Sequence, residues 1–249
     1  MPDPGAPPIG VNRRVQLICA WCGPIFMVML AIGLLFIAGL VPPPSPSDSA
    51  AHVAAFYRDH RGQVRAGLLI CLAGTPLLAP FVALISYQLK RSDPDLAPFA
   101  DVQLMCGVVL LMLFLIPELM LAVAVFRTNG SPQVTRTLND ISWTTFVWTF
   151  SFPVVEYGAT GLAILMDRSR IPLYPRWVGI AELAIAVLFI PGAPTIWVMH
   201  GPFSWRGALA FWLVFAAFGV WIFMMFFCQL RAIDRQAERF EQASVAPAS

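Results

Sequence analysis

The sequence predicts an all-α membrane protein built as a bundle of six transmembrane helices. The chain is 58% hydrophobic and only 12% charged, whereas roughly a quarter of the residues in soluble domains are charged. A helix needs about 20 apolar residues to cross the hydrocarbon core of a bilayer. Six stretches reach that length, at residues 15–41, 66–89, 100–126, 141–166, 177–199 and 208–230.

The first apolar stretch determines how the chain is divided. It is about 27 residues long, whereas the apolar core of a signal peptide has roughly 7 to 15 residues. We therefore expect it to be retained as the first span. The predicted organisation is a cytoplasmic N-terminal segment at 1–14, a six-helix transmembrane domain at 15–231 and a cytoplasmic C-terminal tail at 232–249.

The basic residues of the loops predict the orientation, because Lys and Arg accumulate on the cytoplasmic side of membrane proteins. One side carries ten of them, namely Arg13, Arg14, Lys90, Arg91, Arg168, Arg170, Arg176, Arg231, Arg235 and Arg239. The other side carries six, namely Arg58, Arg61, Arg65, Arg127, Arg136 and Arg206. Both termini are therefore predicted to lie in the cytoplasm. Tryptophans near the predicted span ends agree with this placement of the spans.

The first predicted outer loop has two parts. Its proline-rich beginning at 42–46 favours a stiff, extended chain, and the capping residues at 47–49 then predict a short helix from Ala50 to about Arg61. Val53 and Tyr57 lie on one apolar face of that helix, so it is expected to be amphipathic and to lie along the membrane surface. It could be a cover over the bundle or a gate for a substrate.

Four of the prolines within the spans are predicted to bend or break their helices. Pro76 and Pro80 lie in the second span, Pro117 in the third and Pro153 in the fourth. A proline removes one backbone donor and clashes with the preceding turn, so a helix is expected to bend or break there. Such breaks are usually structural, although discontinuous helices also form binding sites in transporters.

Three glutamates within the spans are the main candidates for function. Glu118 directly follows Pro117, Glu156 comes three residues after Pro153, and Glu182 lies in the fifth span. A carboxyl in the hydrocarbon region is costly unless it is protonated, paired or hydrated. No Lys or Arg is expected at this depth, and desolvation then favours the neutral acid. We expect Glu118 and Glu156 to be protonated, or to share a proton or cation. If their helices pack together, the three carboxyls are expected to form a staggered column from the outer half of the membrane to its inner interface.

Hydroxyl groups are expected around the second of these carboxyls. Tyr157 follows Glu156 directly, and Thr149 lies two turns before it. Three interpretations of this polar interior remain open. The glutamates could simply hydrogen-bond across helices and hold them together, they could relay protons or cations, or they could recognise a polar or cationic group on a small amphiphile.

Cysteine and histidine patterns predict neither a redox centre nor a metal site. The phrase Trp21-Cys22-Gly23-Pro24 is similar to a thioredoxin-like active site, but Ile25 stands where the second cysteine belongs. All five cysteines lie in or beside apolar stretches, so a disulfide framework is not expected. His52, His60 and His200 would form a metal site only if the outer loops brought them together with an acid such as Asp59.

No cofactor is predicted. The only lysine, Lys90, lies in a loop, which excludes a Schiff base in the middle of a span. The spans also lack the histidines that usually ligate haem, and the chain has no phosphate-binding or hydrolase motif. The net charge of +2 is spread over the loops and forms no basic patch, so nucleic acid is not an expected partner.

Several short motifs carry a resemblance to a known group of proteins. They are the segment 42–49, Ala54-Ala55-Phe56-Tyr57, Leu138-Asn139-Asp140, Pro175-Arg176-Trp177, Gly201-Pro202-Phe203 and Ala210-Phe211-Trp212. With these motifs in this order, the chain resembles uncharacterised six-span integral membrane proteins of actinobacteria and some proteobacteria, to which no activity is assigned. The resemblance implies a bacterial inner membrane and no particular active site.

The sequence favours a small-molecule or ion-coupled carrier or binder that uses an acidic intramembrane pocket. The alternative is a non-catalytic accessory or assembly subunit of a larger membrane complex, and a membrane-embedded enzyme is the third interpretation. The expected partners are the lipid bilayer, a small amphiphile, cation or proton, and a membrane-protein partner or a second copy of the chain.

Overall fold

A computed structural model of the protein describes residues 13–127, 129–169 and 172–245, with side chains as far as 236. Most of the predicted N-terminal segment at 1–14 therefore lies outside the described residues. Within them every regular element is helical. Six helical segments are long and apolar enough to cross a membrane, which confirms the predicted six-helix bundle. The protein is an integral, multi-pass membrane protein.

Each of the six spans consists of more than one helical piece. The first comprises α1 (Arg13–Ala31) and the π-helical η1 (Ile32–Ile37), and the second comprises α3 (Arg61–Gly74), η2 (Thr75–Leu77) and α4 (Leu78–Ser92). The third comprises η3 (Pro94–Leu96) and α5 (Ala97–Phe126), and the fourth α6 (Pro132–Trp148) and α7 (Ser151–Met166). The fifth comprises α8 (Arg176–Phe189) and the 3-10 helix η4 (Ile190–Trp197), and the sixth η5 (Ala208–Leu213) and α9 (Val214–Val245).

Helix α5 has a central position, because it packs against α3, α4, α6 and α7. Helix α9 packs against α1, α4 and α8, so the first and last spans are neighbours. Buried aromatic rings join these parts. The ring centroids of Phe26 and Phe114 lie 5.2 Å apart, and those of Phe114 and Phe218 lie 5.3 Å apart. The core thus connects α1, α5 and α9 directly.

The prolines act differently from one span to the next. The second span changes to a 3-10 turn at Pro76, and Pro80 falls in the first turn of α4. The fourth span is interrupted between α6 and α7, with Pro153 in the first turn of α7. Helix α5 continues through Pro117, so the helix is not broken there. Neighbouring helices in a membrane bundle can satisfy the freed backbone groups and keep such a helix intact.

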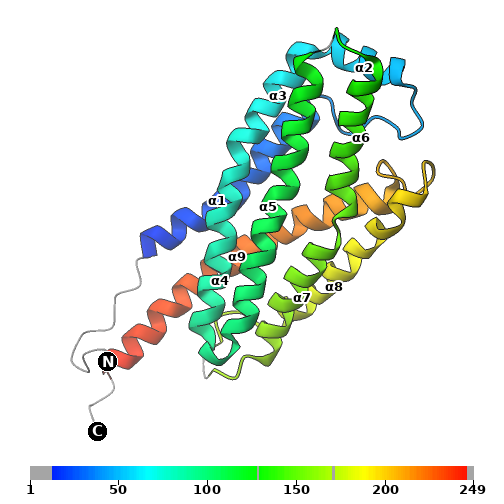
Figure 1. Ribbon diagram of the computed structural model, residues 1–249. Coiled ribbons are helices and arrows are strands. Elements are labelled where there is room, and N and C mark those ends of the chain that lie inside the picture. The colour runs from blue at the N-terminus through cyan, green and yellow to red at the C-terminus, as the bar shows by residue number, and fades with distance from the viewer. Residues whose placement is uncertain (1–12, 128, 170–171, 246–249) are drawn as a thin grey trace.

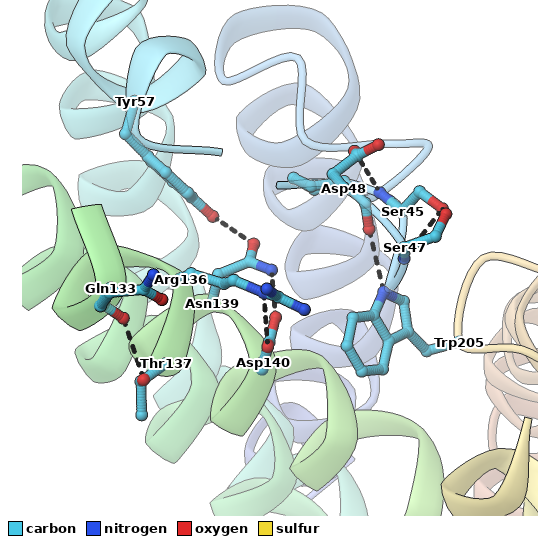
Figure 2. Close-up of polar contacts among 11 residues, drawn as sticks. Ser45, Ser47, Asp48, Tyr57, Gln133, Arg136, Thr137, Asn139, Asp140 and Trp205 are labelled. Atoms are coloured by element: carbon cyan, nitrogen blue, oxygen red, sulfur yellow. Dashed lines mark hydrogen bonds and ion pairs between the residues drawn. The ribbon is translucent and has the colours of Figure 1, made fainter. Parts of the chain in front are cut away.

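The expected amphipathic helix of the first outer loop is present as α2 (Ala50–Asp59), which lies across one end of the bundle (Figure 1). The side chain of Ser49 caps it by accepting a hydrogen bond from the His52 amide at 3.2 Å. Tyr57 is completely buried, and its hydroxyl donates to Asn139 Oδ1 of α6 at 2.8 Å (Figure 2). This contact fixes α2 as a cover on α6.

The same end of the bundle is closed by chain segments from both halves of the protein. The indole N–H of Trp205 donates to the Pro44 carbonyl at 2.9 Å, which ties the loop before the sixth span to the proline-rich loop after the first (Figure 2). The Asn139 amide also donates to Asp140 at 3.1 Å, and Asp140 forms an ion pair with Arg136 at 3.5 Å. Two separate sets of polar contacts therefore hold the cover at this end of the bundle.

Candidate functional site

Glu118 projects from α5 and is only 5% exposed. Its two carboxyl oxygens lie 2.8 and 3.0 Å from the hydroxyl oxygen of Thr75, in the 3-10 turn of the second span. The same hydroxyl lies 3.1 Å from the carbonyl oxygen of Cys71, which can only accept. A hydroxyl carries a single proton, so it cannot donate to both groups. A protonated Glu118 that donates to Thr75 satisfies all three groups.

Glu118 lines a groove of about 230 Å³ that is open to the surface between α3 and α5. Arg65 lies at the other end of this groove, where its guanidinium donates to the carbonyls of Val125 at 3.3 Å and Phe126 at 3.1 Å. Val125 follows Glu118 by two turns, which is about 10 Å along the helix. The groove therefore has a carboxyl at its inner end, a cation at its outer end, and apolar walls between them.

Glu156 of α7 is completely buried, and its Oε1 accepts a hydrogen bond from the Gln103 amide of α5 at 3.4 Å. The carboxyl group fits against α5 because Gly107 has no side chain, and a Cβ atom at that position would lie 3.2 Å from Glu156 Oε1. Glu156 Oε2 and Gln103 Oε1 are both buried without a partner. A carboxylic acid and a primary amide can form a cyclic pair, and in that pair the acid proton satisfies both of these oxygens.

Glu182 of α8 is also completely buried. The indole N–H of Trp221, on α9, lies 2.9 and 3.2 Å from its two carboxyl oxygens. The Tyr157 ring packs against that indole with centroids 4.9 Å apart, within electrostatic range of both Glu156 and Glu182. The Tyr157 hydroxyl is buried and has no hydrogen-bond partner. Glu156, Tyr157 and Glu182 thus gather where α5, α7, α8 and α9 meet.

The other predicted residues lie apart from this cluster. Glu118 is separated from Glu156 along α5. It lies three turns, or about 16 Å, beyond Gly107, the residue of α5 that lies beside Glu156. The Thr149 hydroxyl donates to the Thr145 carbonyl of its own helix at 2.7 Å. Thr149 and Pro153 line a small apolar cavity of about 40 Å³ that contains none of the three glutamates. The structure therefore divides the expected column into a Glu118 site and a separate Glu156–Glu182 cluster.

Sequence reasoning missed a set of buried glutamines. Five of them are at most 5% exposed, namely Gln16, Gln88, Gln103, Gln229 and Gln236. At the end of the bundle where α1 begins, the Gln16 amide donates to Gln236 at 3.0 Å and the Gln88 amide donates to Gln16 at 3.4 Å. The signal was present in the sequence, because Gln16, Gln88, Gln103 and Gln229 all interrupt apolar stretches.

Two tyrosines outside the spans connect loops to this polar interior. Tyr174 precedes α8, is nearly fully buried, and donates its hydroxyl to Gln88 Oε1. Tyr57 makes the corresponding contact with Asn139 at the opposite end. Burial disfavours the phenolate, so it raises the pKa of Tyr57 and that of Tyr174 well above the ordinary value. Both tyrosines therefore act as neutral donors at physiological pH.

The residues that would support an enzyme do not converge. His52, His60 and His200 are exposed, and the described part of the chain contains no group of three or more His, Cys, Asp or Glu side chains that could hold a metal ion. All five cysteines are free thiols. The chemistry present inside the described bundle is that of carboxyl, amide, hydroxyl, indole and thiol groups.

The fold and the site together define a polytopic helical membrane protein with carboxyl groups buried between its spans. No known protein family, curated protein or solved structure matches the chain. The function therefore has to be argued from the residues themselves.

Proposed function

We propose that this membrane protein binds and carries a small amphiphile with a cationic group, and that Glu118 is the carboxyl that recognises it. The observation that carries the proposal is that Glu118 lines a groove open to the surface, whereas Glu156 and Glu182 are completely buried. A ligand entering from the lipid would therefore meet Glu118 before either of the other two carboxyls.

The walls of the groove suit an amphiphile. Leu69 and Leu72 on α3, and Phe126 on α5, are exposed apolar residues that a hydrocarbon chain would cover. The carboxyl has only the neutral Thr75 hydroxyl as a partner. An ammonium group that displaces the carboxyl proton would supply the missing countercharge, and hydrogen bonds to a charged group contribute about 1.5–3 kcal/mol.

The experiment measures binding of dodecyltrimethylammonium to the protein in phosphatidylcholine nanodiscs, with empty nanodiscs as the background. We expect the wild type to bind the probe more tightly as the pH rises, because the cation competes with the carboxyl proton. Glu118→Gln should bind about tenfold or more weakly, which corresponds to about 1.4 kcal/mol, and should lose the pH dependence. Uptake of the probe into proteoliposomes then distinguishes a carrier from a binder.

Glu156→Gln is the matched control, because this residue does not line the groove. It replaces a carboxyl group in the same bundle and should leave the affinity for the probe unchanged. Equal affinity and equal pH dependence in the wild type and Glu118→Gln would overturn the proposal.

The second candidate is a non-catalytic accessory or assembly subunit. It is favoured by the contacts of Glu156 with Gln103 and of Glu182 with Trp221. In both, the carboxyl forms a hydrogen bond to a neighbouring helix, which is the role expected of a buried polar group that only holds helices together. If the probe does not bind, and a membrane protein stays attached during gentle purification of both glutamine variants, this second function is supported instead.

The proposal includes a location and an orientation. We place the protein in a bacterial cytoplasmic membrane with both termini in the cytoplasm. The excess of arginine at the end of the bundle where α1 begins and α9 extends supports the orientation, and the resemblance to bacterial six-span proteins supports the membrane.

A further inference from the structure

We propose that a second groove, along α9, binds an anionic phospholipid. This groove has a volume of about 720 Å³ and is lined by residues of α1, α8 and α9. Its lining includes Gly219, Phe227 and Arg231 on α9, Met27 on α1 and Trp177 on α8. It is distinct from the groove that contains Glu118, and the inference does not depend on the proposed function.

The groove has the shape of a site for an acyl chain. At Gly219 there is no side chain to fill it, and a Cβ atom added there would be in ordinary contact with the Met27 methyl group at 3.4 Å. Phe227 is 58% exposed and forms part of the apolar wall. From Gly219 to Arg231 the helix rises about 18 Å, which is close to the roughly 15 Å depth of hydrocarbon in one leaflet.

The charged end of the groove fits a phosphate group. Arg231 is exposed at that end and has no ion pair or hydrogen bond among the described contacts. The nearby acid on the same helix, Asp234, is already paired with Arg13 at 3.0 Å. Arg235 donates instead to the Pro172 carbonyl at 2.8 Å. Arg231 is therefore available to a ligand, and its planar guanidinium matches the geometry of a phosphate.

The exposed indole of Trp177 lies in the same groove. Tryptophan is enriched at the level of the lipid headgroups, so this side chain marks the depth at which the glycerol and phosphate would lie. An apolar groove one leaflet long, an indole at the interface and an arginine without an ion pair among the described side chains together fit a phospholipid with a net negative charge. A basic residue near the membrane surface favours an anionic lipid by roughly fivefold in affinity.

Native mass spectrometry of the delipidated protein tests this inference. Phosphatidylglycerol and phosphatidylcholine with identical acyl chains are titrated separately, and the bound adducts are counted. We expect the wild type to bind phosphatidylglycerol about fivefold more tightly than phosphatidylcholine. Arg231→Gln should lose this preference and Arg231→Lys should keep most of it. Gly219→Leu should weaken the binding of both lipids, because its side chain occupies the channel.

Arg58→Gln is the control, because it removes an exposed arginine from α2 at the opposite end of the bundle. It should retain the preference of the wild type. The inference is overturned if Arg231→Gln still prefers phosphatidylglycerol. It is also overturned if the delipidated protein forms a dimer that Gly219→Leu disrupts and that excludes lipid, because the groove would then hold a second copy of the chain.

Discussion

At the scale of single residues, each buried carboxyl meets a neutral partner instead of a cation. Glu118 meets a threonine hydroxyl, Glu156 a glutamine amide and Glu182 a tryptophan indole. A neutral partner can form a hydrogen bond, but it cannot supply a countercharge for a buried ion. The protonated state expected from the sequence remains a prediction, and these contacts favour it. The partners themselves were not predictable, because Thr75, Gln103 and Trp221 lie on other helices.

The acid–amide pair of Glu156 and Gln103 gives the prediction at this scale. Glu156→Gln should change the free energy of unfolding by less than about 1 kcal/mol, because a second amide can replace a neutral acid. Gln103→Leu should cost about 1–3 kcal/mol, since it leaves a buried polar group without a partner. Thermal unfolding in detergent measures both effects. Gln133→Leu, at an exposed position, is the control and should be nearly neutral.

Infrared spectroscopy tests the protonation state of the same pair. A protonated carboxyl has a carbonyl stretch separate from that of the carboxylate, and at neutral pH Glu156→Gln should remove one such band. Gln103→Leu should shift that band, because it changes the hydrogen bonding of the acid. A protonated-carboxyl band that is equally strong in the wild type and Glu156→Gln, with a carboxylate band lost instead, would show that Glu156 is ionised.

At the scale of elements, the six spans could be predicted but their close crossings could not. Span length depends on a local count of apolar residues, which the sequence provides. A crossing depends on which small residues of two helices meet. Gly161 of α7 and Gly179 of α8 touch in this way, because a Cβ atom on Gly161 would lie 2.8 Å from the Gly179 carbonyl oxygen. Gly33 and Gly67 form a second such crossing between η1 and α3.

Gly161→Ala should therefore destabilise the protein by about 1–3 kcal/mol, because the added methyl group forces two backbones apart. Gly158→Ala on the same helix is the matched control, since a Cβ atom there meets nothing within 4 Å. That change should be neutral or stabilising by up to about 1 kcal/mol, as is usual in a helix interior. Thermal unfolding compares the two variants, and equal melting temperatures would contradict a tight α7–α8 crossing.

At the scale of the whole molecule, the two ends of the bundle are built differently. One end is covered by α2 and the loop containing Trp205 (Figures 1 and 2). At the other, α1 begins beside the extension of α9, and Arg13 pairs with Asp234 (Figure 1). Composition indicated a cover and a charged tail separately. It could not indicate that the first residues of the tail pack onto the bundle, as the bond between Gln16 and Gln236 requires.

The orientation of the bundle in the membrane is the prediction at this scale. Arg231 and Arg235 on α9, and Arg13 and Arg14 on α1, lie at the end opposite α2. Because short loops and span ends on the cytoplasmic side carry the excess of Lys and Arg, this end should face the cytoplasm. A green fluorescent protein fused after residue 249 should then fluoresce, and an alkaline phosphatase fused there should be inactive, because it needs the disulfides of an oxidising compartment.

A second fusion point makes the orientation test decisive. Alkaline phosphatase inserted in the loop at 198–207, beside the cover, should be active if that end faces the periplasm. The opposite pattern at both positions would reverse the orientation and place Arg231 in the outer leaflet. Replacing Arg13, Arg14, Arg231 and Arg235 with glutamine reduces the basic count at the proposed inner side from ten to six, equal to the other side. If charge bias sets the orientation, this variant should give a mixture of both orientations.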